Sequence, residues 1–372
     1  MNKRISLTDT QSITKTKQPL KQRFFSLVKK IDHKQTAIIK MISLAVILGV
    51  VIFLVMFIYH DSQQTNFFIN AHLFEIRSKK AIMAIFSGGA LAVAGLLLQK
   101  ATRNNLADIS LLGIGSLNII IMSFYLLSIK TKIQSNGWEM QILPLIAFLA
   151  SIIGSTIIYI LSRFGGLSSE KFIIVGIALS FLFEAISVVL ANPNANGSNV
   201  NKLSSLFKEA GTLDTTIKVI QKYTYGIIPN SNYIQWNIII PSAVVIIITL
   251  VPIWFLRRKI DLYETSEDLA RTAGVNVERL RLIMYLLVAV LAGTEAVMVG
   301  FVALLGVLGS NVAKQMFGNK TSYTMFGAFL IGSILVTSAL FISSNLNTNI
   351  PVGFLSTTIV VPYFIYLIIR GK

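Results

Sequence analysis

The sequence contains no cysteine among its 372 residues. That absence excludes disulfide bonds, metal sites built on thiolates, and cysteine nucleophiles. Histidine is also scarce: there are three, and none is spaced with carboxylates inside an apolar run as a metal site would require. The sequence therefore predicts no catalytic residue, no metal site and no cofactor bound by this chain, and it does not favour an enzyme embedded in the membrane.

Charged residues are few as well, at 13% of the chain, whereas a soluble domain usually carries about 25%. Hydrophobic residues make up 54%, which indicates an all-α, polytopic membrane protein. The net charge of +17 could suggest nucleic acid. Many of the cations, however, lie in the N-terminal tail and at the ends of apolar runs, where lysine and arginine set membrane topology. We therefore expect membrane lipid around this chain and no nucleic acid.

Apolar runs of about 17–25 residues are long enough to span a membrane as helices. The predicted transmembrane helices lie near 37–59, 81–100, 110–129, 142–162, 172–191, 235–256, 281–299, 301–316, 322–343 and 353–370. The sequence thus predicts two parts, a basic cytoplasmic tail over 1–36 and a transmembrane domain over 37–372. Lysine and arginine are frequent in the loops that would lie on the tail's side, so both termini are expected in the cytoplasm. Three outer regions, including Arg77–Lys80 and the polar loop 192–233, also carry cations and weigh against that orientation.

The predicted span over 81–100 is lined with small residues, including Gly88 and Gly95, and carries Gln99 near its end. Small residues allow helix backbones to approach closely in lipid, which indicates a packed bundle. Two acidic residues, Glu184 and Glu295, fall inside other apolar spans. A carboxylate in hydrocarbon is costly, so each either lines a pathway or gate or is a protonated or hydrogen-bonded packing residue. We take these five residues as pathway or gate candidates.

A polar segment over 260–279 separates two predicted spans. Thr265 or Ser266 can cap a short helix there, and Gly274 suits the left-handed conformation that ends one. The expected helix of about two turns would carry its acids in the first turn and a small apolar stripe. Its residues are Ser266, Glu267, Asp268, Leu269, Ala270 and Ala273, with Gly274 after them. It is either an ordinary connector or a helix that docks in a groove of a cytoplasmic partner.

Three blocks of residues together resemble one known family. The first block comprises Arg77-x-x-Lys80, Gly88-Gly-Ala-Leu-Ala92, Gly95, Gln99, Arg103-Asn-Asn-Leu-Ala107 and Leu112-Gly113. The second is Ser266-Glu-Asp-Leu-Ala-Arg-Thr-Ala-Gly-Val275, and the third comprises Gly300-Phe-Val302, Pro351-Val-Gly353 and Pro362-Tyr-Phe364. Across about residues 40–370 the chain resembles the FecCD-type permease subunits of type II ABC importers for iron-siderophores, haem and vitamin B12.

This resemblance implies ten helices, two permeases around a central pathway, two ATPase subunits that bind ATP and magnesium, and a substrate-binding protein that is lipid-anchored or periplasmic. It implies that Arg77 and Lys80 meet the binding protein and that Ser266–Ala273 couples to the ATPase. Ferric siderophores are the first expected substrate, with haem and cobalamin as alternatives. A secondary transporter driven by an ion gradient is the rival outside the family.

The sequence also departs from the family's pattern. Asn105 replaces the proline of the R-N-P-L-A motif, and Gly300–Leu308 lacks the Pro-His of its own motif. The family's later docking arginine has no counterpart in Ser343–Ile350. These changes resemble the branch of catecholate-siderophore importers found in Gram-positive-type bacteria. They also suggest a heterodimer, in which a second permease supplies the missing arginine, although a homodimer stays open.

Overall fold

The computed structural model is all-helical in the residues it describes, which are 20–58, 71–113, parts of 117–160, 169–191, 226, 228, 236–300, 302–345 and 350–370. Contacts divide the chain into two units, Met1–Lys40 and Met41–Lys372. The predicted division at residue 36 into tail and transmembrane domain stays a prediction. The outer loop predicted over 192–233 lies almost wholly outside the described residues.

Eight of the ten predicted spans coincide with described helices. The helices are α1 (Leu20–Phe57), α2 (Ala71–Thr102), α5 (Ser169–Ala191), α8 (Trp236–Thr265), α10 (Val277–Met298), α11 (Leu305–Phe317), α12 (Thr321–Asn345) and α13 (Val352–Arg370), with the short helices η1 (Ile109–Leu112) and α9 (Glu267–Thr272) between them. The spans predicted over 110–129 and 142–162 are described only in part. The expectation of an all-α membrane protein is confirmed.

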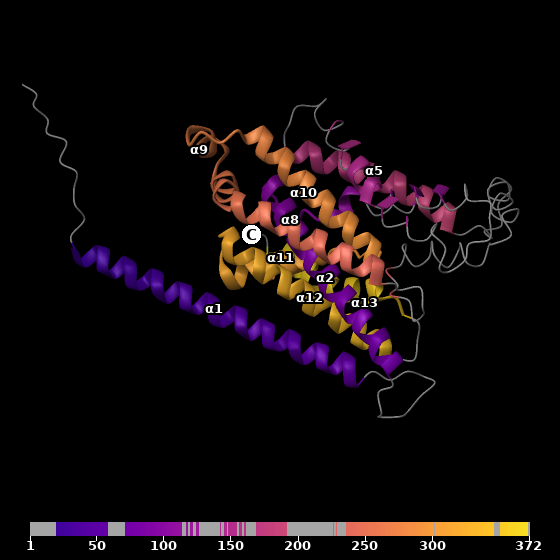
Figure 1. Ribbon diagram of the computed structural model, residues 1–372. Helices are drawn as coiled ribbons and strands as arrows, with labels where there is room; N and C mark the ends of the chain where they lie inside the picture. The colour runs from indigo at the N-terminus through magenta and orange to yellow at the C-terminus, as the bar shows by residue number, and fades with distance from the viewer. Residues whose placement is uncertain are drawn as a thin grey trace, which may run out of the picture. The chain divides into compact units, whose positions relative to one another are not determined.

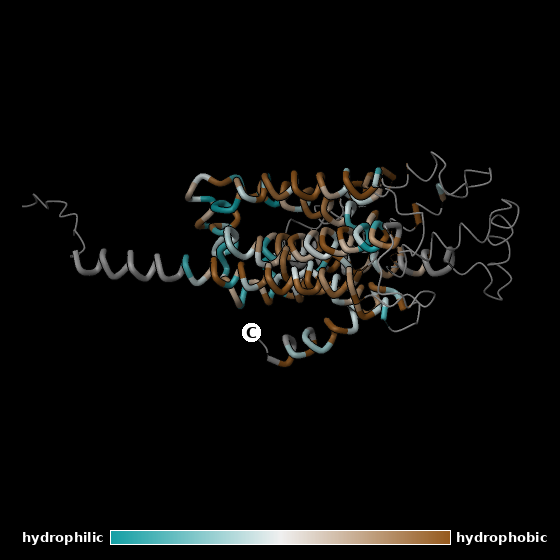
Figure 2. Tube along the Cα trace, turned by 60° about the horizontal axis from the view of Figure 1, so that its bottom comes forward, coloured by the Kyte–Doolittle hydropathy of each residue, from teal (hydrophilic) through white to brown (hydrophobic). Residues whose placement is uncertain are grey.

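Five of the described helices are long and apolar enough to cross a membrane, within α1, α2, α8, α10 and α12. Figure 2 shows that hydrophobic residues predominate along the coloured helices of the bundle. Several helices run further than their apolar cores predicted. α2 begins ten residues before Ala81 and so contains Arg77 and Lys80, and α8 continues past Arg257 to Thr265. Charged residues at span ends can remain helical, so hydropathy alone makes these two helices too short.

α2 is the central helix of the second unit and packs against α8, α10, α11 and α12 (Figure 1). Its middle is closely packed because two glycine pairs face one another. A Cβ added at Gly88 would collide with the backbone of Gly332 on α12, and one added at Gly95 would lie 2.5 Å from the Cα of Gly306 on α11. These contacts confirm that the small residues of this span let neighbouring backbones approach closely.

α11 corresponds to the eighth predicted span but has only 13 residues. At 1.5 Å per residue it is about 20 Å long, shorter than the roughly 30 Å of a bilayer's hydrocarbon core. The chain before it is not helical: Gly300 has φ 92° and Leu304 has φ 59°. Val299 and Val302 on either side of Gly300 are buried, so this irregular backbone lies inside the protein. Non-helical backbone at membrane depth is tolerated in such buried positions.

Candidate functional site

α9 forms as its sequence predicts. The Ser266 side chain caps its first turn by accepting a hydrogen bond from the Leu269 N–H, and the chain leaves the helix at Gly274 with φ 78°. The acids Glu267 and Asp268 stand in the first turn, where the helix dipole favours negative charge. Ala270 is fully buried, whereas Leu269 is 47% exposed. α9 therefore uses Ala270 to hold itself on the bundle and leaves an apolar side chain facing outward.

A chain of polar contacts fastens α9 to the bundle. Glu267 accepts a hydrogen bond from the Arg281 guanidinium of α10 at 3.2 Å, and Arg281 Nε donates to the Tyr263 hydroxyl at 3.0 Å. That hydroxyl donates in turn to the carbonyl of Ala101 on α2, at 2.9 Å. The hydrogen bond from Arg271 and the nearby charge of Arg281 lower the pKa of Glu267. We call Glu267, Arg281, Tyr263 and Ala101 the Tyr263 chain.

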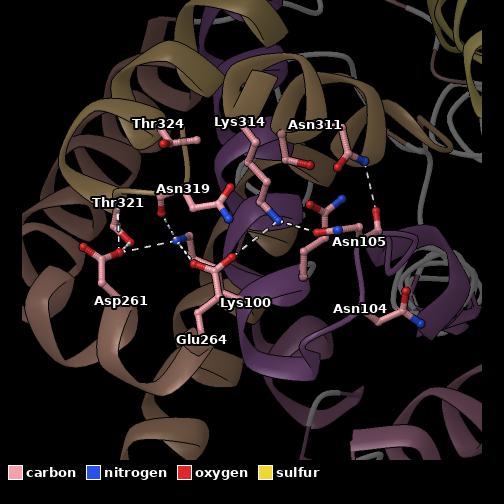
Figure 3. A network of polar contacts seen from close by, with 12 residues as sticks. Lys100, Asn104, Asn105, Asp261, Glu264, Asn311, Lys314, Asn319, Thr321 and Thr324 are labelled. Atoms are coloured by element: carbon pink, nitrogen blue, oxygen red, sulfur yellow. Dashed lines mark hydrogen bonds and ion pairs between the residues drawn. The ribbon is translucent and has the colours of Figure 1, made fainter. Parts of the chain in front are cut away.

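Beside the Tyr263 chain lies a second polar group, shown in Figure 3, which we call the four-charge cluster: Lys100, Asp261, Glu264 and Lys314. The Lys100 side chain has no exposed surface and donates to Glu264, to Asp261 at 3.4 Å and to the carbonyl of Asn319 at 2.6 Å. Lys314 Nζ lies 3.9 Å from Glu264. The sequence placed position 100 at the end of the predicted span over 81–100; in the structure Lys100 lies in the last turn of α2 and is wholly buried.

The four-charge cluster, whose members lie on α2, α8 and α11, also reaches α12 and the turn at Asn105. Asp261 accepts hydrogen bonds from the backbone N–H of Thr321 at 2.9 Å and from its hydroxyl at 2.5 Å, so it caps the start of α12 from α8. Lys314 of α11 donates to the Asn105 side chain at 2.8 Å. Asn105 stands where the family's motif has proline, and its carbonyl accepts from Asn311 of α11 at 2.9 Å. Four helices thus meet at one cluster beside α9.

The pathway candidates lie in different settings. Glu295 is buried in α10, and Ser87 of α2 donates to its carboxylate at 3.3 Å. Gln99 is 1% exposed, and its side-chain amide has no hydrogen-bond partner among the described residues. Glu184 lies in α5, but its side chain is outside the described residues. Gly88 and Gly95 serve the helix packing described above. A role for any of the five in a pathway or gate stays a prediction.

The two residues predicted to meet the binding protein are both buried in this chain. Arg77 is 8% exposed and donates from Nη1 to the carbonyl of Met56 on α1 at 2.8 Å, and Lys80 is 3% exposed. The neighbouring cation Lys79 is partly buried, pairs with Glu75 at 2.8 Å and lies over the Trp236 ring of α8. Docking at Arg77 and Lys80 therefore stays a prediction, and their burial weighs against a direct ion pair with another protein.

The arrangement joins α9 to the helix bundle. Among the residues that the structure describes, no three histidine or acidic side chains form a group able to hold a metal ion. The polar contacts instead tie a short, capped helix with an exposed face to the ends of α2, α8, α10, α11 and α12. Sequence reasoning found α9 but missed this network, because the residues that form it are more than 150 positions apart in most of the pairs.

Comparisons with known proteins agree with this architecture. The sequence model of the FecCD transport family matches residues 35–370. The iron(3+)-hydroxamate import system permease protein FhuG of Bacillus subtilis (strain 168) is 27% identical over 305 residues, which cover 81% of this chain and 84% of the relative. The hemin transport system permease protein HmuU of Yersinia pestis is 26% identical over 304 residues, covering 80% and 83% respectively.

A solved structure described as an inward-facing conformation of a metal-chelate type ABC transporter superposes with a TM-score of 0.70 and 18% sequence identity. The superposition covers 91% of this chain and 99% of that chain. At this identity the likeness establishes the fold, and it confirms the expected ABC-importer permease architecture.

Proposed function

Because this chain belongs to the FecCD transport family and is thus a permease subunit of an ABC import system, we propose that it carries ferric siderophores across a bacterial cell membrane. A permease of this family is a non-catalytic transmembrane component. ATP is bound by partner ATPase subunits, and no cofactor belongs to this chain.

The partners we propose are two ATPase subunits on the cytoplasmic side, a second permease, and a lipid-anchored or periplasmic substrate-binding protein outside. Both termini lie in the cytoplasm in this proposal, so α9 also faces the cytoplasm. The absence of cysteine allows a clean test of this orientation. A cysteine introduced at Thr272 of α9 should react with a membrane-impermeant thiol reagent only after the cells are made permeable. Labelling in intact cells would show that α9 lies outside the cell and that the proposed orientation is wrong.

The geometry of α9 supports the proposal that this helix binds the ATPase subunits. A short helix that caps itself, buries Ala270 and leaves Leu269 exposed is a suitable insert for a groove on another protein. When ATP closes the ATPase dimer, α9 would be displaced as a rigid body. The Tyr263 chain and the four-charge cluster would pass that displacement to the membrane helices, which would then open the pathway to the opposite side.

A helix-breaking substitution tests this coupling role. Ala270→Pro should leave the permease in the membrane while uptake is lost, because proline cannot continue a helix and removes its N–H. The N–H of Ala270 donates to Ser266 at 3.1 Å, so this contact would disappear. Thr272→Ala on the exposed side of α9 is the matched control. Uptake at the wild-type rate in the Ala270→Pro variant would exclude α9 as the coupling element.

The substrate follows from relatives named for iron(3+)-hydroxamate and hemin import, with siderophore more frequent among the names of the family. Cells that lack this gene, with and without a plasmid copy, should be given radioactive iron as a ferric catecholate, a ferric hydroxamate or haem. We expect the plasmid copy to restore uptake of at least one of the two siderophores. Restoration of haem uptake alone would assign the chain to haem import instead.

A heterodimer is the proposed assembly, since the family's later docking arginine is missing from Ser343–Ile350. Affinity purification of the tagged chain should bring down a second, different permease together with the ATPase. If the chain expressed without any other permease assembled with the ATPase and supported normal uptake, the assembly would be a homodimer.

A further inference from the structure

We propose that Lys100 is the positioning residue that makes the α9 end of α8, the end of α2 and the start of α12 move as one body when the ATPase displaces α9. This inference rests on the proposed importer function and adds the place at which ATP-driven motion enters the membrane helices. It concerns the four-charge cluster of Figure 3, which neither a family motif nor the sequence pattern assigned to coupling.

The first argument is the geometry of the Lys100 ammonium. An ammonium has three N–H donors. In this protein it has three acceptors: Glu264 and Asp261 on α8, and the carbonyl of Asn319 immediately before α12. The group therefore joins three separate segments at once. α8 cannot slide past α2, or move away from the start of α12, without breaking at least one of these contacts.

The second argument is the charge balance of the cluster. The two lysines, Lys100 and Lys314, face the two carboxylates, Asp261 and Glu264, so the cluster is neutral as a whole. The lysine side chains are 0% and 8% exposed, and a buried charge that loses its partner is strongly destabilising. A partly broken cluster is therefore unfavourable. The contacts are expected to persist together during a movement, which makes the cluster stiff.

The third argument is where the cluster lies along the chain. Glu264 is two residues before Ser266, which caps α9, so a movement of α9 reaches Glu264 directly. The Tyr263 chain reaches α2 at Ala101, the residue next to Lys100. Two adjacent positions of α2 thus receive two independent links from the α8–α9 junction. Without Lys100 the α8–α9 junction would reach α2 at Ala101 alone among these two positions, and α12 would keep its bonds to Asp261 but lose its connection to α2 through Asn319.

The functional test compares Lys100→Met with the matched control Lys259→Met. Methionine is an unbranched, uncharged side chain one heavy atom shorter than lysine, and Lys259 is an exposed lysine on α8 outside the cluster. In cells that lack the chromosomal gene, we expect Lys100→Met to lower siderophore uptake at least about tenfold. The ATPase activity of the purified complex should stay within about twofold of wild type, because the ATPase subunits still bind α9. Lys259→Met should match wild type in both measurements.

A distance measurement separates positioning from general stability. Because the chain lacks cysteine, spin labels can be placed through Thr272→Cys on α9 and Lys320→Cys before α12, both exposed positions. With Lys100 present, the distance between the labels should be narrow and the same with and without trapped nucleotide. In the Lys100→Met background it should broaden or shift on nucleotide trapping.

Normal uptake together with an unchanged label distance in Lys100→Met would overturn the proposal. If that variant does not accumulate in the membrane, Glu264→Gln gives the same contrast, because it keeps an oxygen for Lys100 while removing one charge. Unchanged uptake and distance in Glu264→Gln would overturn the proposal equally. If wild type itself restores no siderophore uptake, the proposed substrate is wrong, and the label distance still decides the role of Lys100.

Discussion

The carboxylate of Asp108 accepts a hydrogen bond from the backbone N–H of Leu304 at 3.1 Å, although the two residues are 196 positions apart. It also accepts from the N–H of Val307 at 3.2 Å and from Ser110. Leu304 stands at the N-cap of α11 with no side chain able to cap it, so Asp108 supplies the missing cap from a distant part of the chain. One buried carboxylate therefore fixes the start of both η1 and α11.

Asp108→Ala should accordingly destabilise the protein by about 2 kcal/mol, because it leaves buried N–H groups without acceptors. Asp108→Asn should lose less, since its amide oxygen can still accept. The measurement is thermal unfolding of the detergent-solubilised protein. Glu278→Gln at the exposed start of α10 is the control and should change the melting temperature little. A melting temperature for Asp108→Ala equal to that of the control would refute the capping role.

Gly88→Ala should destabilise the bundle by about 1–3 kcal/mol, as overpacking of a closely packed core does. A Cβ at this position meets the backbone of Gly332, which cannot rotate aside as a flexible side chain could. Gly49→Ala on α1 is the matched control, since nothing lies within 4 Å of its added Cβ. The two variants should differ clearly in unfolding temperature and in the yield of intact protein. Equal stability of the two would mean that α2 and α12 can separate without cost.

Tyr263→Phe should loosen α9 without unfolding the membrane helices. The change removes the hydroxyl that accepts from Arg281 and donates to Ala101, at a cost of about 1–3 kcal/mol for the unmade buried contacts. Hydrogen exchange of the α9 amides should become faster, while exchange in α12 should stay the same. The exposed Tyr366→Phe serves as the control. Unaltered exchange in α9 would show that Ala270 and Glu267 hold this helix without help from Tyr263.

Arg77→Gln combined with Lys80→Gln should weaken capture of the binding protein while the ATPase still assembles. Glutamine is chosen because it removes the charge without burying an acid at these buried sites. Loss of charges that steer a partner mainly slows association and reduces its dependence on salt. The measurement is the association rate of the loaded binding protein with membrane vesicles. An unchanged rate at low salt would assign both residues to packing inside the permease rather than to docking.

The sequence predicts those features that depend on neighbouring residues. Ser266 and Gly274 mark both ends of α9 because a cap and a left-handed glycine act within a few positions. The apolar runs likewise predict the long helices. Hydropathy fails at α11, because a buried bend at Gly300 and Leu304 shortens a stretch that is apolar enough to suggest a full span.

The sequence does not predict contacts between residues that are far apart along the chain. Nothing near Lys100 indicates that it is buried, since its acceptors are 161, 164 and 219 positions away. The pairing of Asp108 with Leu304 is hidden for the same reason, and a leucine offers no sign of an N-cap. Arg77 and Lys80 appear as exposed loop cations until the helix is seen to extend through them. In each case the three-dimensional packing decides whether a charge is a surface feature or a structural link.

The central claim is that this chain is a conduit whose driving force comes from separate ATPase subunits. The most direct measurement places the purified complex, and the permease alone, in sealed vesicles with loaded binding protein. Accumulation of ferric siderophore should require the ATPase and ATP, and the permease alone should accumulate none under a proton or sodium gradient. Sustained concentrative uptake by the permease alone, driven by either gradient, would contradict the account.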